Sequence, residues 1–275
     1  MAKTRNLQNS VIAITGAGSG IGRALALQCA QKGARLALSD VNEASVQETK
    51  TLCTGVSPER ILTSTLDVRN KEAVEAWADA IMKEFGEVNV IINNAGVALN
   101  VSFEHMQYED LKWLMDINYW GVVHGCMAFL PKLKKAKWGH IVNLSSLFGL
   151  IGVPNQTAYN SAKFAVRGLS ESLRMELEMA GYPIGVSCVH PGGIKTNIAN
   201  SARLGQSVGK QMSDQQFKDQ FNKLAQTSAK SAAKTIIEAI ESNNKRVLVG
   251  LDAKIGDAIQ RVTPTFYQKL LKYVM

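Results

Sequence analysis

The chain of 275 residues is long enough for one large domain, and its 46% content of hydrophobic residues is ordinary for a globular protein with a sizeable core. This composition excludes a disordered or low-complexity chain. Net charge is +8, and residues 195–275 contribute most of it, with 13 Lys and Arg against 6 Asp and Glu. A solvated helical surface explains this basic region best, and the basic residues are not interleaved with aromatic ones, so we expect no nucleic-acid partner.

Short β-branched runs alternate with helical stretches, which is the pattern of βαβ units and a parallel sheet. The predicted strands are 11–15, 35–39, 61–67, 88–93, 140–145, 185–189 and 246–249. The predicted helices are 21–32, 42–53, 71–85, 108–133, 157–180 and 228–243. Because no repeat or linker divides the chain, we predict a single domain over 1–275. Its fold class would be α/β, a three-layer doubly wound Rossmann fold with a seven-stranded parallel sheet.

A glycine-rich turn joins the first predicted strand to the first helix. Its glycines permit a tight turn, and backbone N–H groups at the helix N-terminus attract a pyrophosphate. A plain tight turn is the alternative, but the position between strand and helix is the one that dinucleotide binding requires. The candidate cofactor-binding residues of this turn are Gly16, Ser19, Gly20, Ile21 and Gly22.

Asp40 ends the second predicted strand, 24 residues after Gly16. A carboxylate at this position accepts hydrogen bonds from both ribose hydroxyls of NAD and repels the 2′-phosphate of NADP. The neighbours Ser19 and Val41 are not basic, so NAD is the favoured cofactor and NADP the less favoured one. As an alternative, Asp40 caps the helix that begins near Asn42.

Tyr159 and Lys163 lie four residues apart at the start of a long predicted helix, and this spacing places both side chains on one face. A free tyrosine has a pKa near 10 and is a poor base at neutral pH. A lysine ammonium beside it favours the phenolate. The pair can then exchange a proton with an alcohol or a ketone while hydride moves. Such a pair is common by chance, so it needs support from other motifs.

That support comes from several motifs that occur in order along the chain. They are Thr15–Gly22, Asn93–Gly96, Asn118, Ser146, Tyr159 with Lys163, and Pro191-Gly192. Together they resemble the short-chain dehydrogenase/reductase family in its single-domain form, from about Val11 to Thr196 and less distinctively to Val249.

The resemblance implies a role for each matching residue. Tyr159 would be the general acid/base, and Lys163 would lower its pKa and bind the nicotinamide ribose. Ser146 would orient the substrate oxygen, with Ser145 as the competing candidate. Asn118 would hold a water that links Lys163 to solvent, whereas in isolation it would be interpreted as a capping or buried amide.

The resemblance also extends the cofactor site. Asn94 would steady the central strand and the cofactor, and Asp67 with Val68 would contact the adenine. By itself, Asp67 would be interpreted as a helix N-cap. Thr196 closes the Pro191–Thr196 segment that would bind the carboxamide.

The segment of about 193–227 would cover the substrate, and it carries several apolar residues: Ile198, Leu204, Val208, Met212, Phe217, Phe221 and Leu224. Another apolar set, Phe148, Leu150, Ile151 and Val153, would face the same cleft. This lining suits a lipophilic ketone or secondary alcohol. The alternative is that these residues only seal the lid onto the core.

The last residues, about 264–275, form an amphipathic tail with Phe266, Leu270 and Val274 on one face. The tail could contact a membrane surface, but packing on a partner subunit is favoured because one short apolar face attaches weakly to lipid. The family commonly assembles through its two long helices, so we expect a homodimer or homotetramer.

The sequence therefore predicts an NAD-dependent oxidoreductase acting on a small-molecule secondary alcohol or ketone. One alternative is an NADPH-dependent reductase of ketones of the 3-oxoacyl type, and another is a dinucleotide-sensing protein without turnover. The four scattered cysteines fit reduced thiols and no metal site, and the N-terminus lacks a signal peptide, so we expect a cytoplasmic protein.

Overall fold

The computed structural model describes residues 5–196, 203–204 and 226–269. Seven parallel strands form one sheet in the order β11-β7-β6-β4-β1-β2-β3. The strands are β1 (Val11–Thr15), β2 (Arg35–Asp40), β3 (Ile61–Thr65), β4 (Val90–Asn93), β6 (Gly139–Leu144), β7 (Ile184–Pro191) and β11 (Arg246–Val249). The principal helices are α1 (Gly20–Gln31), α2 (Glu43–Leu52), α3 (Lys71–Phe85), α4 (Tyr108–Met115), α5 (Gly121–Leu133), α6 (Thr157–Met179), α9 (Ala229–Ser242) and α10 (Leu251–Val262).

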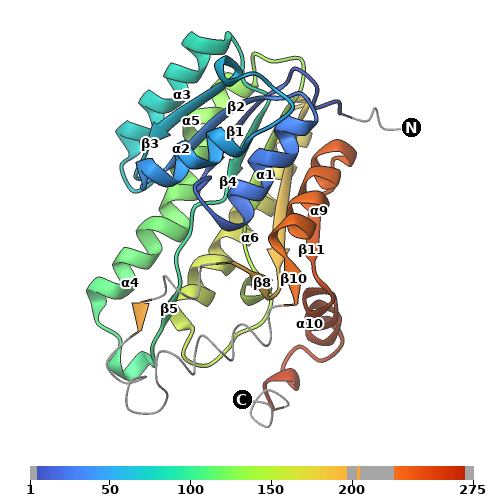
Figure 1. Cartoon of the computed structure of the whole chain (residues 1–275). Helices are drawn as coiled ribbons and strands as arrows, with labels where there is room; N and C mark the ends of the chain where they lie inside the picture. Colours follow the sequence, from blue (N-terminus) through green and yellow to red (C-terminus); the bar gives the residue numbers. More distant parts are fainter. Residues whose placement is uncertain (1–4, 197–202, 205–225, 270–275) are drawn as a thin grey trace.

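Alternate residues of the inner strand β1 point into two separate hydrophobic layers. Ile12 and Ile14 pack with α1 and α9 on one face, and Val11 and Ala13 pack with α3, α5 and α6 on the other (Figure 1). A strand that is covered on both faces needs a continuous apolar run, which is why the parallel strands were recognisable in the sequence. The predicted three-layer Rossmann fold is confirmed.

The carboxyl ends of all seven strands lie at one edge of the sheet, because every neighbouring pair is parallel. The loops that follow β1, β2, β4 and β6 therefore meet at this edge, which is where α/β proteins bind their ligands. Two short parallel pairs are also present: β8 (Ile194–Lys195) with β10 (Thr227–Ser228), and β5 (Leu99–Asn100) with β9 (Arg203–Leu204).

The structure differs from the sequence prediction in two helices. The helix predicted over 108–133 is divided into α4 and α5 by one π-helical segment, η3 (Asp116–Trp120). Helix α10 was not predicted, because Gly256 interrupts its pattern. A Cβ atom at Gly256 would lie 2.6 Å from Leu147 Cδ1, so the helix packs closely on this leucine. No helix among the described residues is long and apolar enough to cross a membrane.

Candidate active site

The turn after β1 brings backbone atoms unusually close together. Gly16 and Gly20 have φ angles of +63° and +54°, which favour glycine. A Cβ at Gly22 would lie 2.1 Å from the Gly16 carbonyl oxygen. Helix α1 then begins at Gly20 without a side-chain capping bond from Ser19 and without an acidic residue in its first turn. Its N-terminal N–H groups are therefore suited to an anionic group such as a pyrophosphate.

Asn94 ties the loop after β4 to this turn. Its Nδ2 donates to the carbonyl oxygens of Thr15 and Gly16 at 2.9 and 3.0 Å. The Thr15 hydroxyl oxygen accepts the N–H groups of Asn94 and Ala95 at 3.0 and 3.1 Å. These bonds hold the two central loops in one arrangement.

The carboxylate of Asp40 lies directly beside the glycine turn. Its Oδ2 accepts the Gly18 N–H at 2.9 Å, and its Oδ1 accepts the Asn42 N–H at 3.0 Å. A Cβ on Gly18 would lie 2.8 Å from Oδ2. The cap of α2 is Asn42, which accepts the Ser45 N–H, so the capping role considered for Asp40 belongs to Asn42.

Arg23 is a cation of this region that the sequence interpretation missed. Its guanidinium donates to the Gly18 carbonyl at 2.5 Å and forms an ion pair with Glu48 at 2.6 Å. Its Nε also donates to the Thr49 hydroxyl. Arg23 thus fastens the glycine turn to α2, and Glu48 balances its charge.

Asp67 and Val68 follow β3 and differ in their surroundings. Asp67 forms an ion pair with Arg69 at 2.6 Å, and the hydrogen bonds from Arg69 lower the pKa of its carboxyl. The cap of α3 is Asn70, not Asp67. Val68 is buried, and its carbonyl oxygen bonds to the ring of His124 at 2.9 Å.

Thr196 lies next to the glycine turn from the opposite side of the loop cluster. A Cβ at Gly20 would be 3.2 Å from the Thr196 methyl group. The Pro191–Thr196 segment therefore approaches the start of α1, although it is remote in sequence. The apolar residues predicted to cover the substrate follow Thr196, and their side chains lie outside the described part of the chain.

Tyr159 and Lys163 project from the first two turns of α6. Lys163 is only 4% exposed, its Nζ donates to the Leu144 carbonyl oxygen at 2.8 Å, and this nitrogen lies 5.6 Å from the centre of the Tyr159 ring. Burial lowers the pKa of Lys163 to about 8. Burial also raises the pKa of Tyr159, and the Ser146 hydroxyl opposes that rise by hydrogen bonding. The pKa of Tyr159 thus lies above its ordinary value, so the phenol keeps its proton at neutral pH.

The two candidate serines occupy different environments. Ser145 is buried and donates to the Lys163 main-chain carbonyl at 2.8 Å. Ser146 is partly exposed, caps the short helix η4 (Leu147–Gly149) by accepting the Phe148 N–H, and faces the Tyr159 phenol. The geometry thus gives Ser146 access to a substrate and gives Ser145 a supporting contact with α6.

Asn118 lies fully buried in the π-helical segment. Its side-chain amide forms two bonds of 2.8 Å with the backbone of Val97, accepting the N–H and donating to the carbonyl. A Cβ on Gly96 would lie 3.2 Å from Asn118 Oδ1 and 3.7 Å from Lys163 Nζ. Gly96 therefore fills the narrow space between the amide and the ammonium group.

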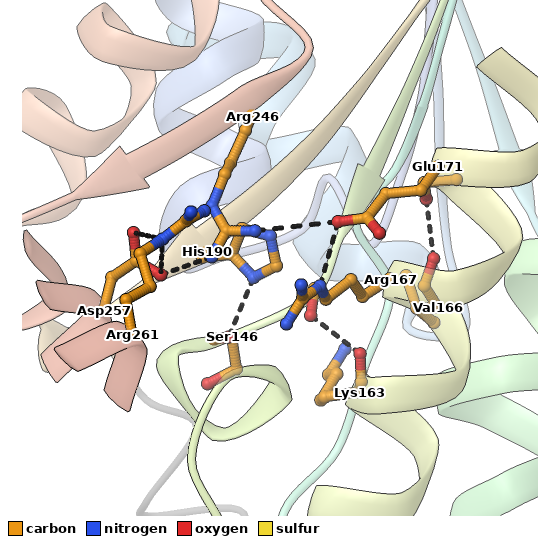
Figure 2. Close-up of polar contacts among 11 residues, drawn as sticks. Ser146, Lys163, Val166, Arg167, Glu171, His190, Arg246, Asp257 and Arg261 are labelled. Carbon is orange, nitrogen blue, oxygen red and sulfur yellow. Dashed lines mark hydrogen bonds and ion pairs between the residues drawn. The ribbon is translucent and has the colours of Figure 1, made fainter. Parts of the chain in front are cut away.

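Two further residues support the catalytic loop and were missed in the sequence. Asn160 donates to the carbonyls of Phe148 and Ile151, both at 2.7 Å, and accepts the Val153 N–H. His190 bonds through Nδ1 to the Ser146 carbonyl at 3.1 Å, as Figure 2 shows. Burial lowers the pKa of His190 to about 4, so at pH 7 the ring is neutral and Nδ1 carries its proton. A polar residue inside the Tyr-x-x-x-Lys motif was the only signal for Asn160.

The apolar set between Ser146 and Tyr159 is divided by the fold. Leu150 and Ile151 are buried, whereas Phe148 and Val153 are partly exposed. The Phe148 ring meets the Tyr159 ring edge to face at 6.2 Å between centres. Only part of the predicted cleft lining therefore reaches the surface beside Tyr159.

Among the described residues, no cluster of His, Cys, Asp or Glu could hold a metal ion. Cys29, Cys53, Cys126 and Cys188 are buried free thiols, and burial raises the pKa of each.

A doubly wound parallel sheet with a glycine turn after β1 and polar groups after β4 and β6 defines a Rossmann-type oxidoreductase. Comparison with known proteins gives the family. The profile of the short chain dehydrogenase family matches residues 10–207, which is more than half of the chain. The chain belongs to the short-chain dehydrogenase/reductase family, whose members use NAD(P) as cofactor.

Several relatives are similar over most of the chain. The putative oxidoreductase SadH of Mycobacterium tuberculosis is 46% identical over 267 residues, covering 97% of this chain and 95% of the relative. Epidermal retinol dehydrogenase 2 of Mus musculus is 37% identical over 195 residues, covering 70% of this chain and 63% of the relative. A Burkholderia phymatum short chain dehydrogenase/reductase, solved in complex with NAD, has a TM-score of 0.85 and 30% identity, covering 97% of this chain and 95% of that one.

Proposed function

We propose that this oxidoreductase transfers hydride between NAD(H) and a lipophilic secondary alcohol or ketone, with Tyr159 as the general acid/base. The observation that carries the proposal is the arrangement of the Tyr159 phenol, which faces Ser146 while Lys163 lies behind its ring. When bound, the nicotinamide accepts or supplies the hydride. The chain's own groups then bind the substrate oxygen and move its proton.

Each of these groups has a role that its contacts support. The Ser146 hydroxyl orients the substrate oxygen toward the phenol of Tyr159. Lys163 has a pKa of about 8, so it is mostly charged at pH 7 and favours the phenolate when an alcohol is oxidised. Asn118, buried beside Gly96 near Lys163, would hold a water that links Lys163 to solvent, and its bonds to Val97 fix the neighbouring loop.

The cofactor-binding residues are proposed from the loops that meet at the sheet edge. The N-terminus of α1 has no side-chain cap, so its N–H groups fit a pyrophosphate. Asn94 holds the loop after β4 against the glycine turn. Asp67 and Val68 lie at the end of β3, on the adenine side, and Thr196 lies beside Gly20.

NAD is the proposed cofactor because the Asp40 carboxylate lies at the carboxyl end of β2 against the glycine turn. It would accept ribose hydroxyls and repel a 2′-phosphate. The nearby cation Arg23 already pairs with Glu48. The residue after Asp40, Val41, is exposed but uncharged, so it cannot neutralise a 2′-phosphate. The alternative, an NADPH-dependent ketone reductase, would need a cation from another segment. The complete Tyr159, Lys163, Ser146 and Asn118 set argues against a dinucleotide sensor without turnover.

A lipophilic substrate is supported by the aromatic edge that Phe148 presents to Tyr159. The similarity to a protein named a retinol dehydrogenase points in the same direction.

A homodimer or homotetramer through the long helices is also part of the proposal. Helices α5 and α6, with the π-helical segment before α5, expose large apolar side chains that a partner would cover: Trp120, Met127, Phe164, Met175 and Met179.

The test is steady-state turnover of the full chain with alcohols and ketones of increasing hydrophobicity, each with NAD(H) and NADP(H). We expect turnover with NAD(H), kcat/KM rising with apolar chain length, and loss of turnover in Tyr159→Phe. Faster turnover with NADPH would support the reductase alternative. Dinucleotide binding without turnover of any substrate would support the sensor.

A further inference from the structure

Helix α10 carries a row of large apolar side chains that face solvent. Leu251, Ile255 and Ile259 recur every four residues, and Val262 joins them on the same side. Leu251 is 70% exposed and Val262 81%. Phe266, in the turn after the helix, is also exposed. We name these five residues the α10 stripe. Scattered exposed apolar residues need no explanation, but a continuous row on one helix indicates a binding surface.

The opposite face of α10 holds the helix firmly on the protein. Asp257 is buried and pairs with both Arg246 of β11 and Arg261, as Figure 2 shows. Asp252 accepts the Gly193 N–H at 2.6 Å. Beyond the helix, the Tyr267 hydroxyl accepts the Gly152 N–H at 3.0 Å. The stripe is therefore presented outward on a fixed helix.

The charges of α10 are sorted between its two faces. Of its two acidic residues, Asp257 is buried between the arginines, and Asp252 is partly exposed and bonded to the Gly193 N–H. The exposed charged residues beside the stripe are Lys254 and Arg261, and Lys269 follows beyond Phe266. Asp257 is shared by two arginines, so this trio keeps a net positive charge. The border of the stripe is thus cationic.

We propose that the α10 stripe docks on an anionic lipid surface. An apolar helix face bordered by Lys and Arg is the pattern of helices that lie in the plane of a membrane interface, because apolar side chains enter the acyl boundary while cations meet the headgroups. A second copy of this chain is less suitable. Two-fold pairing of α10 would bring cationic borders together, and the acidic residues that could neutralise them are occupied inside the protein.

This proposal also revises the interpretation of the C-terminal tail. The sequence indicated only one short apolar face, in a tail of about 264–275. For that face alone, packing on a partner subunit was favoured over contact with a membrane. The row now begins at Leu251 and includes Phe266, so the apolar surface available to lipid is longer than the sequence indicated. The proposal concerns where the protein binds and does not depend on its reaction.

The test is cosedimentation of the full chain with vesicles of phosphatidylcholine alone or with phosphatidylserine added. We expect binding at least about tenfold tighter with phosphatidylserine, and weaker binding in high salt. The double variant Leu251→Gln with Ile255→Gln should bind at least about tenfold more weakly, and Lys254→Gln about fivefold. Thermal unfolding and light scattering should show unchanged stability and oligomer mass.

Matched controls place the same types of substitution, Leu→Gln and Lys→Gln, on helices α2 and α3, away from α10. Leu52→Gln at the end of α2 and Lys83→Gln on α3 alter exposed residues and should leave vesicle binding unchanged. Three results would overturn the proposal: no binding to phosphatidylserine vesicles, equal loss of binding in the controls, or a lower oligomer mass in the α10 double variant. The last result would assign the stripe to a second copy.

Discussion

Replacing Lys163 with methionine should stabilise the protein at pH 7 while abolishing most of its turnover. Lys163 is almost fully buried, and its Nζ donates a hydrogen bond to the Leu144 carbonyl. Burial lowers its pKa from 10.5 to about 8. One pKa unit corresponds to about 1.4 kcal/mol, so holding the charged form in the folded protein costs about 3 kcal/mol. Methionine fills a similar volume without a charge.

The substitution also has a cost, because the Leu144 carbonyl loses its donor. An unsatisfied buried acceptor destabilises by about 1–3 kcal/mol. The expected net gain at pH 7 is thus about 1 kcal/mol, or about 2–4 °C in Tm.

The sign of the effect should reverse at high pH. Below pH 8, Lys163 is charged in both the folded and the unfolded states, and the folded wild-type protein carries the full cost of burial. Between pH 8 and pH 10.5 the folded state releases its proton while the unfolded state keeps it, so wild-type stability rises with pH. The methionine variant has no such group. By pH 10 it should therefore be the less stable of the two proteins.

Urea unfolding of both proteins at pH 7 and pH 10 measures this crossover. Lys83→Met, at an exposed position on α3, is the matched control and should change stability by less than about 0.5 kcal/mol at either pH. If Lys163→Met destabilises the protein equally at both pH values, then Lys163 is not a buried charge, and the argument that it favours the phenolate of Tyr159 also fails.

Three further predictions concern the proton donor, the cofactor and the core. Tyr159→Phe should lower kcat by about 10²–10⁴-fold while NAD still binds, as followed by cofactor fluorescence; near-normal kcat would remove Tyr159 from the mechanism. Asp40→Asn should lower kcat/KM with NAD about tenfold or more and lower Tm modestly because its amide keeps only one accepting oxygen, whereas Asp40→Ala should lower Tm by several degrees because it loses both backbone hydrogen bonds. An unchanged NAD preference in both variants would contradict the role of Asp40. Gly125→Ala would place Cβ 1.9 Å from Asn93 Oδ1, so urea unfolding should show a loss of about 1–3 kcal/mol; a neutral effect would mean that Asn93 moves aside freely.

The sheet was predictable because its strands are covered on both faces. Val90–Asn93 and Gly139–Leu144 are buried at every position, and the short β-branched runs within them, Val90–Ile92 and Ile141–Val142, favour strands over helices. The candidate site was predictable to the extent that its residues lie in local motifs at strand ends. Gly20 is one example, because it belongs to a run of closely spaced glycines after a predicted strand. Tyr159 is another, because its spacing of four from Lys163 places both side chains on one helix face.

The remaining features depend on contacts between distant segments. The pKa of Lys163 is set by burial that only the folded chain creates. The role of His190 follows from its bond to Ser146, which is 44 residues earlier. Helix α10 escaped prediction because Gly256 weakens its helical propensity, and because its packing partner Leu147 is distant in the sequence.

The π-helical segment at Asp116–Trp120 has wider turns than the α-helix on either side, so it holds an extra residue in the helix. Deleting one residue from it would restore the regular repeat. Because the wider turn absorbs the extra residue, α4 and α5 would keep nearly the same faces, and the residues of the bulge itself would change position. Asn118 would then swing away from Val97, and its amide would leave the neighbourhood of Lys163. Substitutions can adjust this helix gradually, but its length through the bulge tolerates no single-residue change.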